Sequence, residues 1–344
     1  MATTKVGIAP MKAAQIAKAG GDFEIVDRQI PNPGAGEVRI KVQACGVCHS
    51  DVFVKEGLWP GLQYPRVPGH EVAGIIDELG AGVIGWTKGQ RIGVGWHGGQ
   101  DNTCIECRRG RFLYCRNPKV AGFSYDGGYQ QYMVAPIEAL AAIPETLSDA
   151  EAAPLLCAGV TTFNALRHSG ASPGSLVAVQ GVGGLGHLGI QFASKFGYKV
   201  AAIGRGPENA SLAKKLGAVV YIDAQSTNAA QELQKLGGAQ AILATAPSSK
   251  AMSELIDGLA PSGKFVVVGI STDPIEVTPL QLIVGEHSLA GSAVGTPTDS
   301  EDTMNFAELT GVRPMIETYT LEKAAEAYAR MMSGKAQFRV VLTM

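Results

Sequence analysis

Three short motifs, far apart in the chain, offer side chains that together could hold one zinc ion with a free coordination position. Cys48 opens the sequence Cys-His-Ser-Asp, His70 lies in Pro-Gly-His-Glu, and Cys157 follows two leucines. Two thiolates and one imidazole leave the fourth position of a tetrahedral zinc ion open, which distinguishes a catalytic site from a closed structural one. An alcohol or carbonyl oxygen could bind there. The motifs therefore indicate zinc-assisted chemistry on an oxygen-bearing substrate.

Two acidic residues stand close to these candidate ligands. Asp51 follows Cys48 within the same motif, and Glu71 directly follows His70. Carboxylates so placed commonly orient a ligating imidazole or balance the charge of the metal. We expect both to support the zinc ion in this way, and Glu71 is also an alternative fourth ligand. Cys45, inside an apolar stretch, is expected to pack in the core.

A glycine-rich turn provides the second chemical motif. Its candidate cofactor contacts are Gly181, Gly183, Gly184, Leu185 and Gly186. The turn lies between a short apolar strand expected at 176–179 and an amphipathic helix expected at 185–196. Glycines allow a tight turn and the close approach of a dinucleotide pyrophosphate, which the N-terminus of the following helix faces. A plain strand-to-helix turn can carry the same glycines, but the flanking elements favour a nucleotide site.

The end of the next strand bears on which nicotinamide cofactor binds. Enzymes that use NAD place an acidic residue there, about 20 positions after the glycine turn, on the ribose 2′-hydroxyl. Here the strand ends in Gly204 and Arg205, with no carboxylate at its tip. Arg205 could pair with a 2′-phosphate, although a solvated loop arginine is the alternative. The sequence favours NADP(H) and leaves NAD(H) open. Val268, at the end of a later strand, is a further candidate contact.

The elements that must position these residues fall into two patterns. Short β-rich runs at 37–43, 74–78, 91–94 and 131–135 predict a mostly β, partly open antiparallel barrel in the N-terminal part. From about residue 174, apolar strands alternate with helices, which predicts an α/β unit with a doubly wound parallel sheet covered on both faces. We expect a zinc-binding catalytic domain of residues 1–156 and 293–344, ending in a strand at 338–342, and a dinucleotide-binding domain of residues 157–292.

Composition limits the function classes. The chain has 344 residues, 46% of them hydrophobic and 17% charged, which fits a two-domain globular protein. A net charge of −2 gives no basic surface for nucleic acid or anionic lipid, so neither is an expected partner. No apolar run is long enough to span a membrane, and no secretory pattern opens the chain. Six clustered cysteines then favour metal chemistry in the cytoplasm over disulfides.

Together these motifs resemble the zinc-dependent medium-chain alcohol dehydrogenases, over essentially the full length of the chain. The resemblance rests on residues 46–51, 68–71, the cysteine-rich loop 101–115, Cys157 and the turn 181–186. It implies a GroES-like catalytic domain, a Rossmann domain and an NAD(P)-dependent alcohol dehydrogenase activity. In such an enzyme, zinc polarises the substrate oxygen and a hydride passes directly between the carbon and the nicotinamide.

The resemblance also implies roles for individual residues. Ser50 corresponds to the residue that passes the substrate proton to the cofactor ribose, and His49 to the basic residue at the pyrophosphate. Thr161 corresponds to a residue that packs on the nicotinamide, and Arg339 to a C-terminal contact of a cofactor phosphate. Plain scaffold is the alternative for Thr161 and Arg339.

One position departs from the family pattern. Members of the family commonly carry a histidine five residues after the first zinc ligand, where it ends the proton relay. Here that position is Phe53, and a phenyl ring cannot carry a proton. We expect the relay to end through the ribose hydroxyl and water, or through His49. The pH–rate profile should then lack the relay-histidine limb.

The cysteine-rich loop resembles the family's second zinc site, which normally has four cysteines. Cys104, Cys107 and Cys115 match three of them, and Asp101 stands where the first would be. A carboxylate is also an anionic zinc ligand. We therefore expect a structural zinc at these four residues and two zinc ions per subunit. The alternatives are an empty loop held by packing, or His97 in place of Asp101.

Substrate and assembly are less constrained. Phe53, Trp59 and Trp96 lie near the zinc motifs and could wall an apolar substrate pocket, although Trp96 could equally be barrel core. The resemblance to bacterial and yeast members of the family implies a homotetramer. A polyol or sugar-alcohol dehydrogenase and a non-catalytic protein that binds zinc and a nucleotide remain the alternative functions. A zinc-free quinone or enoyl reductase is disfavoured, because it should lack the ligand set of Cys48, His70 and Cys157.

Overall fold

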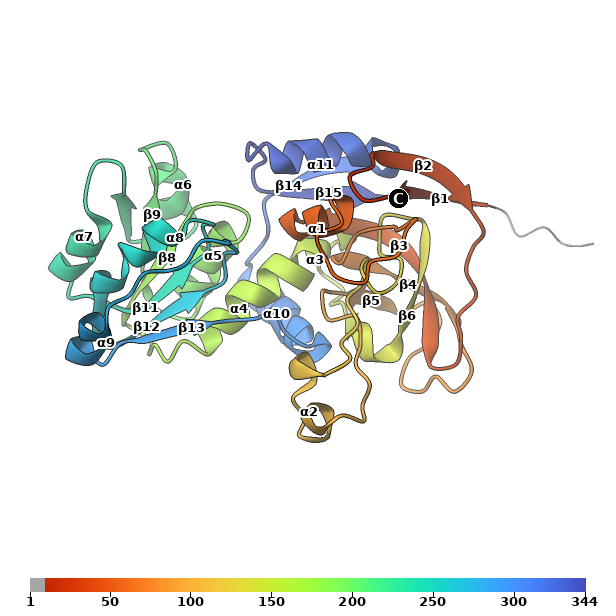
Figure 1. Cartoon of the computed structure of the whole chain (residues 1–344), viewed down its shortest axis with the longest axis horizontal. Helices are drawn as coiled ribbons and strands as arrows, with labels where there is room; N and C mark the ends of the chain where they lie inside the picture. Colours follow the sequence, from red (N-terminus) through yellow and green to blue (C-terminus); the bar gives the residue numbers. More distant parts are fainter. Residues whose placement is uncertain (1–9) are drawn as a thin grey trace, which may run out of the picture. The chain divides into compact units, whose positions relative to one another are not determined.

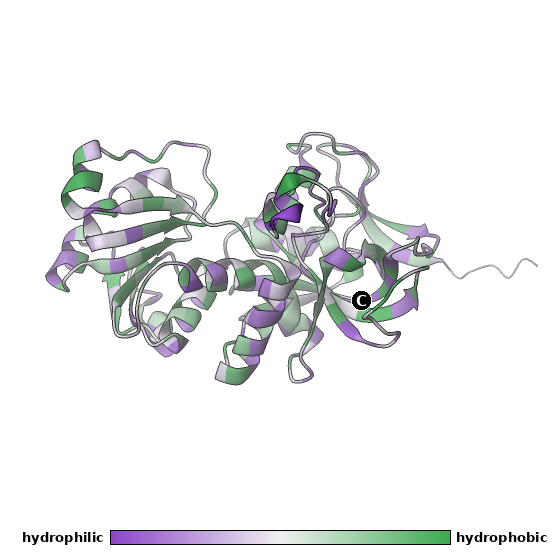
Figure 2. Ribbon diagram, turned by 90° about the horizontal axis from the view of Figure 1, so that it is seen from below, coloured by the Kyte–Doolittle hydropathy of each residue, from purple (hydrophilic) through white to green (hydrophobic). Residues whose placement is uncertain are grey.

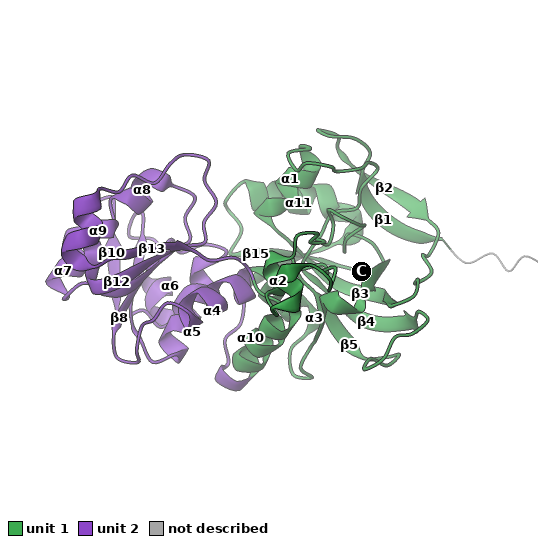
Figure 3. Cartoon of the chain, turned by 60° about the horizontal axis from the view of Figure 1, so that its bottom comes forward, with its two compact units in different colours: residues 1–157, 295–308, 315–344 green, residues 158–294, 309–314 purple. Residues whose placement is uncertain are grey.

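The computed structural model describes residues 10–344, which form two compact units (Figure 3). Of the described residues, unit 1 contains 10–157, 295–308 and 315–344, and unit 2 contains 158–294 and 309–314. The short segment 309–314 was expected in the catalytic domain. This segment belongs to unit 2 because Gln191 of that unit binds its backbone. The side-chain amide of Gln191 donates to the carbonyl oxygen of Arg313 at 3.0 Å, and its side-chain oxygen accepts from the backbone N–H of Arg313 at 3.2 Å.

Unit 1 is built mainly of strands, with short helices between them (Figure 1). Its elements are β1 (Met11–Ile16), β2 (Phe23–Arg28), β3 (Glu37–Val47), α1 (Val52–Lys55), β4 (Val72–Leu79), β5 (Arg91–Val94), α2 (Ile105–Arg108), β6 (Tyr132–Pro136), β7 (Leu140–Ala142), α3 (Asp149–Pro154), α10 (Pro297–Thr310), β14 (Ile316–Thr320), α11 (Ala324–Met332) and β15 (Arg339–Thr343).

The main sheet of unit 1 has the strand order β14-β15-β3-β4-β5-β7, and β6 also pairs with β3. Its pairs are antiparallel except for β14 and β15, which are parallel. The N-terminal part is thus antiparallel, as expected, and the parallel pair of this sheet lies in the C-terminal segment. These two strands can be parallel because α11 connects them and provides the long crossover that a parallel pair needs.

Strand β3 shows how the sequence places the first candidate ligand. Val38, Ile40 and Val42 alternate with more exposed residues and are almost fully buried, as expected for a strand with one face on the core. From residue 44 onwards every residue of the strand is buried. The chain thus carries Cys48 into the interior, directly after the strand ends.

Unit 2 alternates helices with short buried strands. Its elements are α4 (Val160–Arg167), β8 (Leu176–Gln180), α5 (Gly186–Lys195), β9 (Lys199–Gly204), α6 (Ala210–Lys215), β10 (Val220–Asp223), α7 (Ala229–Lys235), β11 (Ala239–Ala244), α8 (Ser249–Ser253), β12 (Leu259–Val267), α9 (Pro279–Gly285) and β13 (Ser288–Gly291).

The six strands of unit 2 form one parallel sheet in the order β10-β9-β8-β11-β12-β13. Strands β8, β9 and β11 are almost wholly buried and largely apolar, as expected for strands covered on both faces. Figure 2 colours the whole chain by the hydropathy of each residue. The strand order reverses between β8 and β11, and ligands of such sheets bind at the carboxyl ends of the strands near this reversal. The predicted α/β fold with a parallel Rossmann sheet is confirmed. Within residues 10–344, no helix is long and apolar enough to cross a bilayer.

Candidate functional site

Four side chains of unit 1 converge on one point, and we call them the Cys48 cluster: Cys48, His70, Glu71 and Cys157. One potential ligand atom of each lies within 4.8 Å of those of the others. The sulfur atoms of Cys48 and Cys157 are 3.9 Å apart, although the two residues are 109 positions apart in the chain. His70 and Glu71 are fully buried. The fold therefore assembles all three candidate zinc ligands together with the expected supporting glutamate.

Each member of the Cys48 cluster comes from the end of an element. Cys48 follows β3, and His70 and Glu71 directly precede β4. Cys157 lies in a π-helical turn, Leu155–Gly159, between α3 and α4. Such turns insert an extra residue into a helix and are frequent at functional sites. A Cβ at Gly95 would come within 2.6 Å of the carbonyl of Leu156, so glycine is needed there for the turn to approach the barrel.

Asp51 holds two members of the Cys48 cluster in place. Its Oδ2 accepts hydrogen bonds from the backbone N–H of Cys48 at 2.9 Å and from the hydroxyl of Tyr129 at 2.8 Å. Its Oδ1 lies 3.3 Å from Nδ1 of His70. The carboxylate thereby orients the imidazole so that Nε2 is the nitrogen left for a ligand, a common arrangement behind a ligating histidine. Sequence reasoning identified Asp51 but missed Tyr129.

Glu71 is anchored through one oxygen. Its Oε1 pairs with the guanidinium of Arg339, which is only 5% exposed. Burial raises the pKa of Glu71 to about 7, and the charge of Arg339 opposes that rise. Arg339 was expected to contact a cofactor phosphate. In the structure its guanidinium binds a carboxylate beside the cluster, and the phosphate contact stays a prediction.

The donor set fits a zinc ion. Nε2 of His70 and Oε2 of Glu71 are buried and have no hydrogen-bond partner among the described residues. A hydrogen bond from Cys157, together with the charge of His70, holds the pKa of the Cys48 thiol well below its usual range despite burial. Buried polar atoms without partners are costly, and a cation bound by sulfur, nitrogen and oxygen would satisfy them.

Aromatic rings cover one side of His70. The ring centroid of Trp96 lies 5.0 Å from that of His70, and Phe123 lies 5.0 Å from Trp96 and 6.1 Å from His70. Trp59 packs edge-on against both Trp96 and Phe123. Phe53 is half-buried in α1, 6.3 Å from Trp59. Sequence reasoning missed Phe123, because no local pattern brings the segment around residue 123 next to His70.

The two proposed proton carriers lie in the turn that follows Cys48. Ser50 is half-buried and His49 is exposed, both in the 3₁₀ turn His49–Asp51. Because the turn begins at Cys48, Ser50 is held close in the chain to the Cys48 cluster, while His49 reaches solvent.

The second cluster, the Cys104 cluster, consists of Asp101, Cys104, Cys107 and Cys115, whose candidate ligand atoms also lie within 4.8 Å of one another. The sulfur of Cys104 is 3.6 Å from that of Cys107 and 3.9 Å from that of Cys115. His97 is not in this set, and its Nε2 is instead 2.6 Å from the side-chain oxygen of Gln100. The geometry thus favours Asp101 over His97 as the fourth donor.

Local hydrogen bonds shape the Cys104 cluster. Asp101 Oδ1 accepts from the backbone N–H groups of Cys104 and Thr103, and Oδ2 accepts from Asn117 at 2.6 Å. These bonds hold the pKa of Asp101 well below its usual range. The sulfur of Cys115 accepts from the backbone N–H groups of Asp101 and Asn117 at 3.4 Å each. The carboxylate of Asp101 is therefore an anionic donor, as a zinc ligand must be.

The glycine turn of unit 2 joins β8 to α5. Gly181 has a φ of +94°, which favours glycine, and a Cβ at Gly186 would overlap the carbonyl oxygen of Gly181. A Cβ at Gly183 would meet nothing within 4 Å, so the backbone there is open to a ligand. Gly184 and Leu185 are half-buried, and Leu185 is the residue directly before α5. The turn has the form that a pyrophosphate site needs.

The remaining candidate cofactor contacts lie at or near the ends of strands and helices of unit 2. Gly204 ends β9, and a Cβ there would overlap the hydroxyl of Tyr221. Arg205 is exposed directly after it. Val268 is half-buried just after β12, and Thr161 is half-buried in the first turn of α4.

A carboxylate missed by sequence reasoning lies near the tip of β9. A Cβ added at Gly206 would overlap Oε2 of Glu208 and lie 3.2 Å from its Oε1. The sequence motif for an NAD site places the acidic residue at the end of β9 itself, where none occurs. Glu208 comes a few residues later and folds back towards Gly206.

The comparisons with known proteins agree with this geometry. Residues 34–145 match the alcohol dehydrogenase GroES-like domain, and residues 184–310 match the zinc-binding dehydrogenase domain. The chain is 44% identical over 333 residues to alcohol dehydrogenase patD of Penicillium expansum, with 97% of each covered. It is 37% identical to an alcohol dehydrogenase of Geobacillus stearothermophilus, covering 96% of this chain and 98% of the relative.

Solved structures of alcohol dehydrogenases are also similar to this chain. A cinnamyl alcohol dehydrogenase of Sorghum bicolor superposes with a TM-score of 0.88 at 30% identity, covering 97% of this chain and 98% of the other. The chain belongs to the zinc-dependent medium-chain alcohol dehydrogenase family. It is an oxidoreductase that interconverts alcohols and aldehydes or ketones, with zinc and a nicotinamide cofactor, and it acts on small molecules. The predicted family and activity are confirmed.

Proposed function

We propose that the reaction occurs at a zinc ion held by Cys48, His70 and Cys157, with Glu71 as supporting residue or alternative ligand. The observation that carries this proposal is the convergence of four donors from three distant segments. Three of the four donors are buried, and two of them have atoms without a hydrogen-bond partner among the described residues. When bound, zinc would polarise the oxygen of an alcohol or carbonyl, and the nicotinamide would accept or donate the hydride.

The protein's own residues then position the metal ligands and move the proton. Asp51 fixes His70 and the backbone at Cys48. Ser50 receives the proton of the alcohol and passes it to the cofactor ribose. Phe53 cannot continue that relay, so the proton leaves through the ribose hydroxyl and water or through His49, whose exposure gives it access to solvent.

The rings beside His70 favour an apolar or aromatic substrate. Trp59, Trp96 and Phe123 present ring edges and faces with few hydrogen-bonding groups, and such walls typically line small-molecule pockets. A related enzyme of known structure is a cinnamyl alcohol dehydrogenase, and a cyanobacterial relative of 33% identity is called an aldehyde reductase. These rings make a polyol a poorer substrate, because its hydroxyl groups need polar partners.

NADP(H) is the proposed cofactor. Arg205 is exposed at the carboxyl end of β9, where a 2′-phosphate would be bound. A Helicobacter pylori structure of 26% identity is complexed with NADP(H), while another of 26% identity is called NAD-dependent. Glu208 near Gly206 opposes the preference, since its carboxylate would repel a phosphate. We favour NADP(H) because the guanidinium of Arg205 would form an ion pair with the 2′-phosphate of this cofactor.

The Cys104 cluster is the proposed second zinc site, which gives two zinc ions per subunit. Its donors are gathered by the loop itself, and the position has one carboxylate and three thiols. All six cysteines are free thiols, which fits a cytoplasmic protein in a reducing compartment.

The oligomer is a proposed homotetramer. Helix α9 exposes Leu280, Ile283 and Val284 by 69%, 73% and 78%, and β13 beside it is an edge strand of the parallel sheet. An exposed apolar face next to an unpaired strand edge is typical of a protein interface. A second copy of the same surface would cover it by two-fold symmetry.

The experiment that tests the function is reduction of benzaldehyde, an aliphatic aldehyde and a ketose by the zinc-loaded protein, with NADPH and NADH compared. We expect turnover with benzaldehyde, and a kcat/KM for NADPH that Arg205→Ala lowers by about 10- to 100-fold. Absence of turnover with every carbonyl compound would leave the non-catalytic alternative. A higher kcat/KM with NADH would refute the NADP(H) preference alone.

A further inference from the structure

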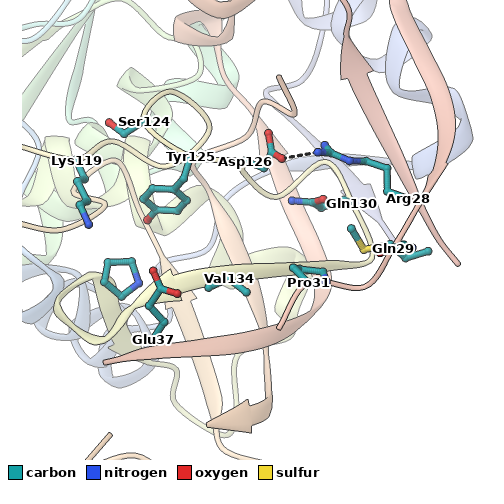
Figure 4. A pocket seen from close by; sticks show the side chains of 12 residues that line it. Arg28, Gln29, Pro31, Glu37, Lys119, Ser124, Tyr125, Asp126, Gln130 and Val134 are labelled. Carbon is teal, nitrogen blue, oxygen red and sulfur yellow. Dashed lines mark ion pairs between the residues drawn. The ribbon is translucent and has the colours of Figure 1, made fainter. Parts of the chain in front are cut away.

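Unit 1 contains a pocket that neither the zinc nor the nucleotide chemistry uses. Its volume is about 330 Å³, and it lies between the end of β2, the strand β6 and the loop 119–130 (Figure 4). This volume is at the lower end of those of small-molecule sites. Arg28, Asp126 and Gln130 line one end of it, and Lys119, Tyr125 and Glu37 line the other (Figure 4).

The end formed by Arg28 has an excess of positive charge. Arg28 Nη2 and Arg66 Nη1 both pair with the carboxylate of Asp126, at 2.9 and 3.3 Å. Two guanidinium groups against one carboxylate leave one positive charge uncompensated. In addition, Nη1 of Arg28 is buried and has no hydrogen-bond partner among the described residues. An N–H group in that state is costly, and a ligand carboxylate that reached it through a small movement of the Arg28 side chain would satisfy both its charge and its hydrogen bond.

The rest of the pocket does not favour a second charge on the ligand. Lys119 and Glu37 at the far end carry opposite charges, so that end has no net preference for an anion. Met11, Pro31 and Val134 also line the pocket and offer an apolar surface. We propose that this pocket binds a small organic monocarboxylate, with its acid group on Arg28 and its apolar body along Val134.

A ligand here would touch residues that lead directly to the Cys48 cluster. Asp126 Oδ1 accepts the backbone N–H of Val67 at 3.0 Å, and the carbonyl of Val67 accepts from Gly127 at 2.8 Å. Val67 is followed by Pro-Gly and then His70. The same loop carries Phe123, whose ring lies against Trp96 beside His70. Through Asp126 the pocket is therefore connected to the segment that leads to His70.

The test uses the full-length, zinc-loaded enzyme and fluorine NMR with two probes, para-fluorobenzoate and its neutral analogue para-fluorobenzamide. We expect saturable binding of the acid, at least about tenfold tighter than that of the amide, because a charged hydrogen bond is lost in the amide. Arg28→Gln should weaken binding of the acid by about tenfold or more, and Val134→Phe should block it by filling the pocket. Readout by NMR is independent of turnover, so failure of the proposed function would not affect it.

A matched control removes a different arginine. Arg330 pairs with Glu317 and has a side-chain exposure of 36%, against 30% for Arg28, and it lies outside the pocket. Arg330→Gln should leave binding of para-fluorobenzoate unchanged. Three results would each overturn the proposal. They are equal affinity for the acid and the amide, unchanged binding of the acid in both Arg28→Gln and Val134→Phe, and absence of saturation below about 10 mM. Loss of binding on zinc removal alone would also overturn it, because the acid would then be bound at the metal centre.

Discussion

The Cys48 and Cys104 clusters use similar donors in different surroundings. The donors of the Cys48 cluster come from three separate segments, and His70 and Glu71 are fully buried. The donors of the Cys104 cluster lie on one loop, where Asp101 and Cys104 are partly exposed. Within that loop the donors accept backbone N–H groups, whereas in the Cys48 cluster Nε2 of His70 and Oε2 of Glu71 are buried and have no hydrogen-bond partner among the described residues.

This difference indicates how one fold could hold the two proposed zinc ions, a structural one and a reactive one. In the Cys104 cluster the loop satisfies its donors by itself, so an ion there adds stability and needs no fifth partner. In the Cys48 cluster, polar atoms are buried without hydrogen-bond partners, which costs desolvation free energy. Such atoms are available to bind an ion that must also bind a substrate. The predictions below break or sharpen this contrast, beginning with the largest effect.

Removing one sulfur from each cluster should separate the two roles. Cys48→Ser is expected to lower kcat/KM by about a thousandfold or more, because it removes a proposed ligand of the ion that would polarise the substrate. Cys115→Ser should keep kcat/KM within about tenfold of the unchanged enzyme and mainly lower the thermal midpoint. Steady-state kinetics and zinc analysis of both variants check this. An equal loss of activity in the two would refute the assignment of separate roles.

Changing Asp101 to asparagine tests whether the carboxylate supplies charge to the Cys104 cluster. Loss of a supporting residue typically costs about 10- to 100-fold in metal affinity, and loss of a ligand charge should cost at least as much. Zinc per chain, measured after dialysis against a chelator, should fall from two to one in Asp101→Asn and stay at two in Asp101→Cys. Two zinc ions retained by Asp101→Asn would show that the carboxylate is dispensable.

The same carboxylate predicts a pH dependence. Because hydrogen bonds from Cys104, Thr103 and Asn117 lower the pKa of Asp101 in the folded chain, the group stabilises the fold above its unfolded pKa. That contribution is lost as the pH falls through the lowered folded value. Acid unfolding of the metal-free protein should therefore begin at higher pH in Asp101→Asn.

Gly46→Ala tests the crowding around the Cys48 cluster. A Cβ at Gly46 would overlap Oε2 of Glu71, so the carboxylate or the strand must move. We expect a destabilisation of about 1–3 kcal/mol in denaturant unfolding, together with reduced kcat. Gly291→Ala is the control, since a Cβ at Gly291 would meet nothing within 4 Å. Equal stability of the two variants would contradict the crowding.

Phe53→His has the smallest expected effect and concerns only the Cys48 side of the comparison. A histidine there would offer the relay a titratable group, so the pH–rate profile should gain a limb near its ordinary pKa of about 6.5. The profile of kcat/KM between pH 5 and 9 measures this, with Phe53→Leu as the control that cannot titrate. Identical profiles for the histidine and leucine variants would count against the proposed proton path.

Much of the site was predictable because each donor sits in a short motif at the end of an element. Cys48, His70 and the glycine turn 181–186 are recognisable without knowing the tertiary structure, since a strand or helix terminus carries its own local signal. The alternation of strands and helices likewise predicted the parallel sheet. Functional residues at the ends of strands and helices are thus the ones that can best be predicted from local sequence.

The remaining contacts depend on long-range packing, which no local pattern encodes. Tyr129 binds Asp51 across 78 positions, and Arg339 binds Glu71 across 268. Phe123 reaches His70 only because the loop that carries it folds over the segment before β4. The parallel pairing of β14 and β15 was missed for the same reason, because it depends on where α11 directs the chain.

The wide spacing of Cys48 and Cys157 has a consequence for the unfolded chain. A zinc ion bound by both would tie together positions 109 apart, while one bound by Asp101 and Cys115 would close a segment only 14 apart. For a permanent cross-link, the lost entropy of the open chain corresponds to about 4.7 kcal/mol for a 100-residue loop and about 3 kcal/mol for a 15-residue loop. By this reasoning a zinc ion in the Cys48 cluster would reduce the entropy of the unfolded N-terminal half more than a zinc ion in the Cys104 cluster would.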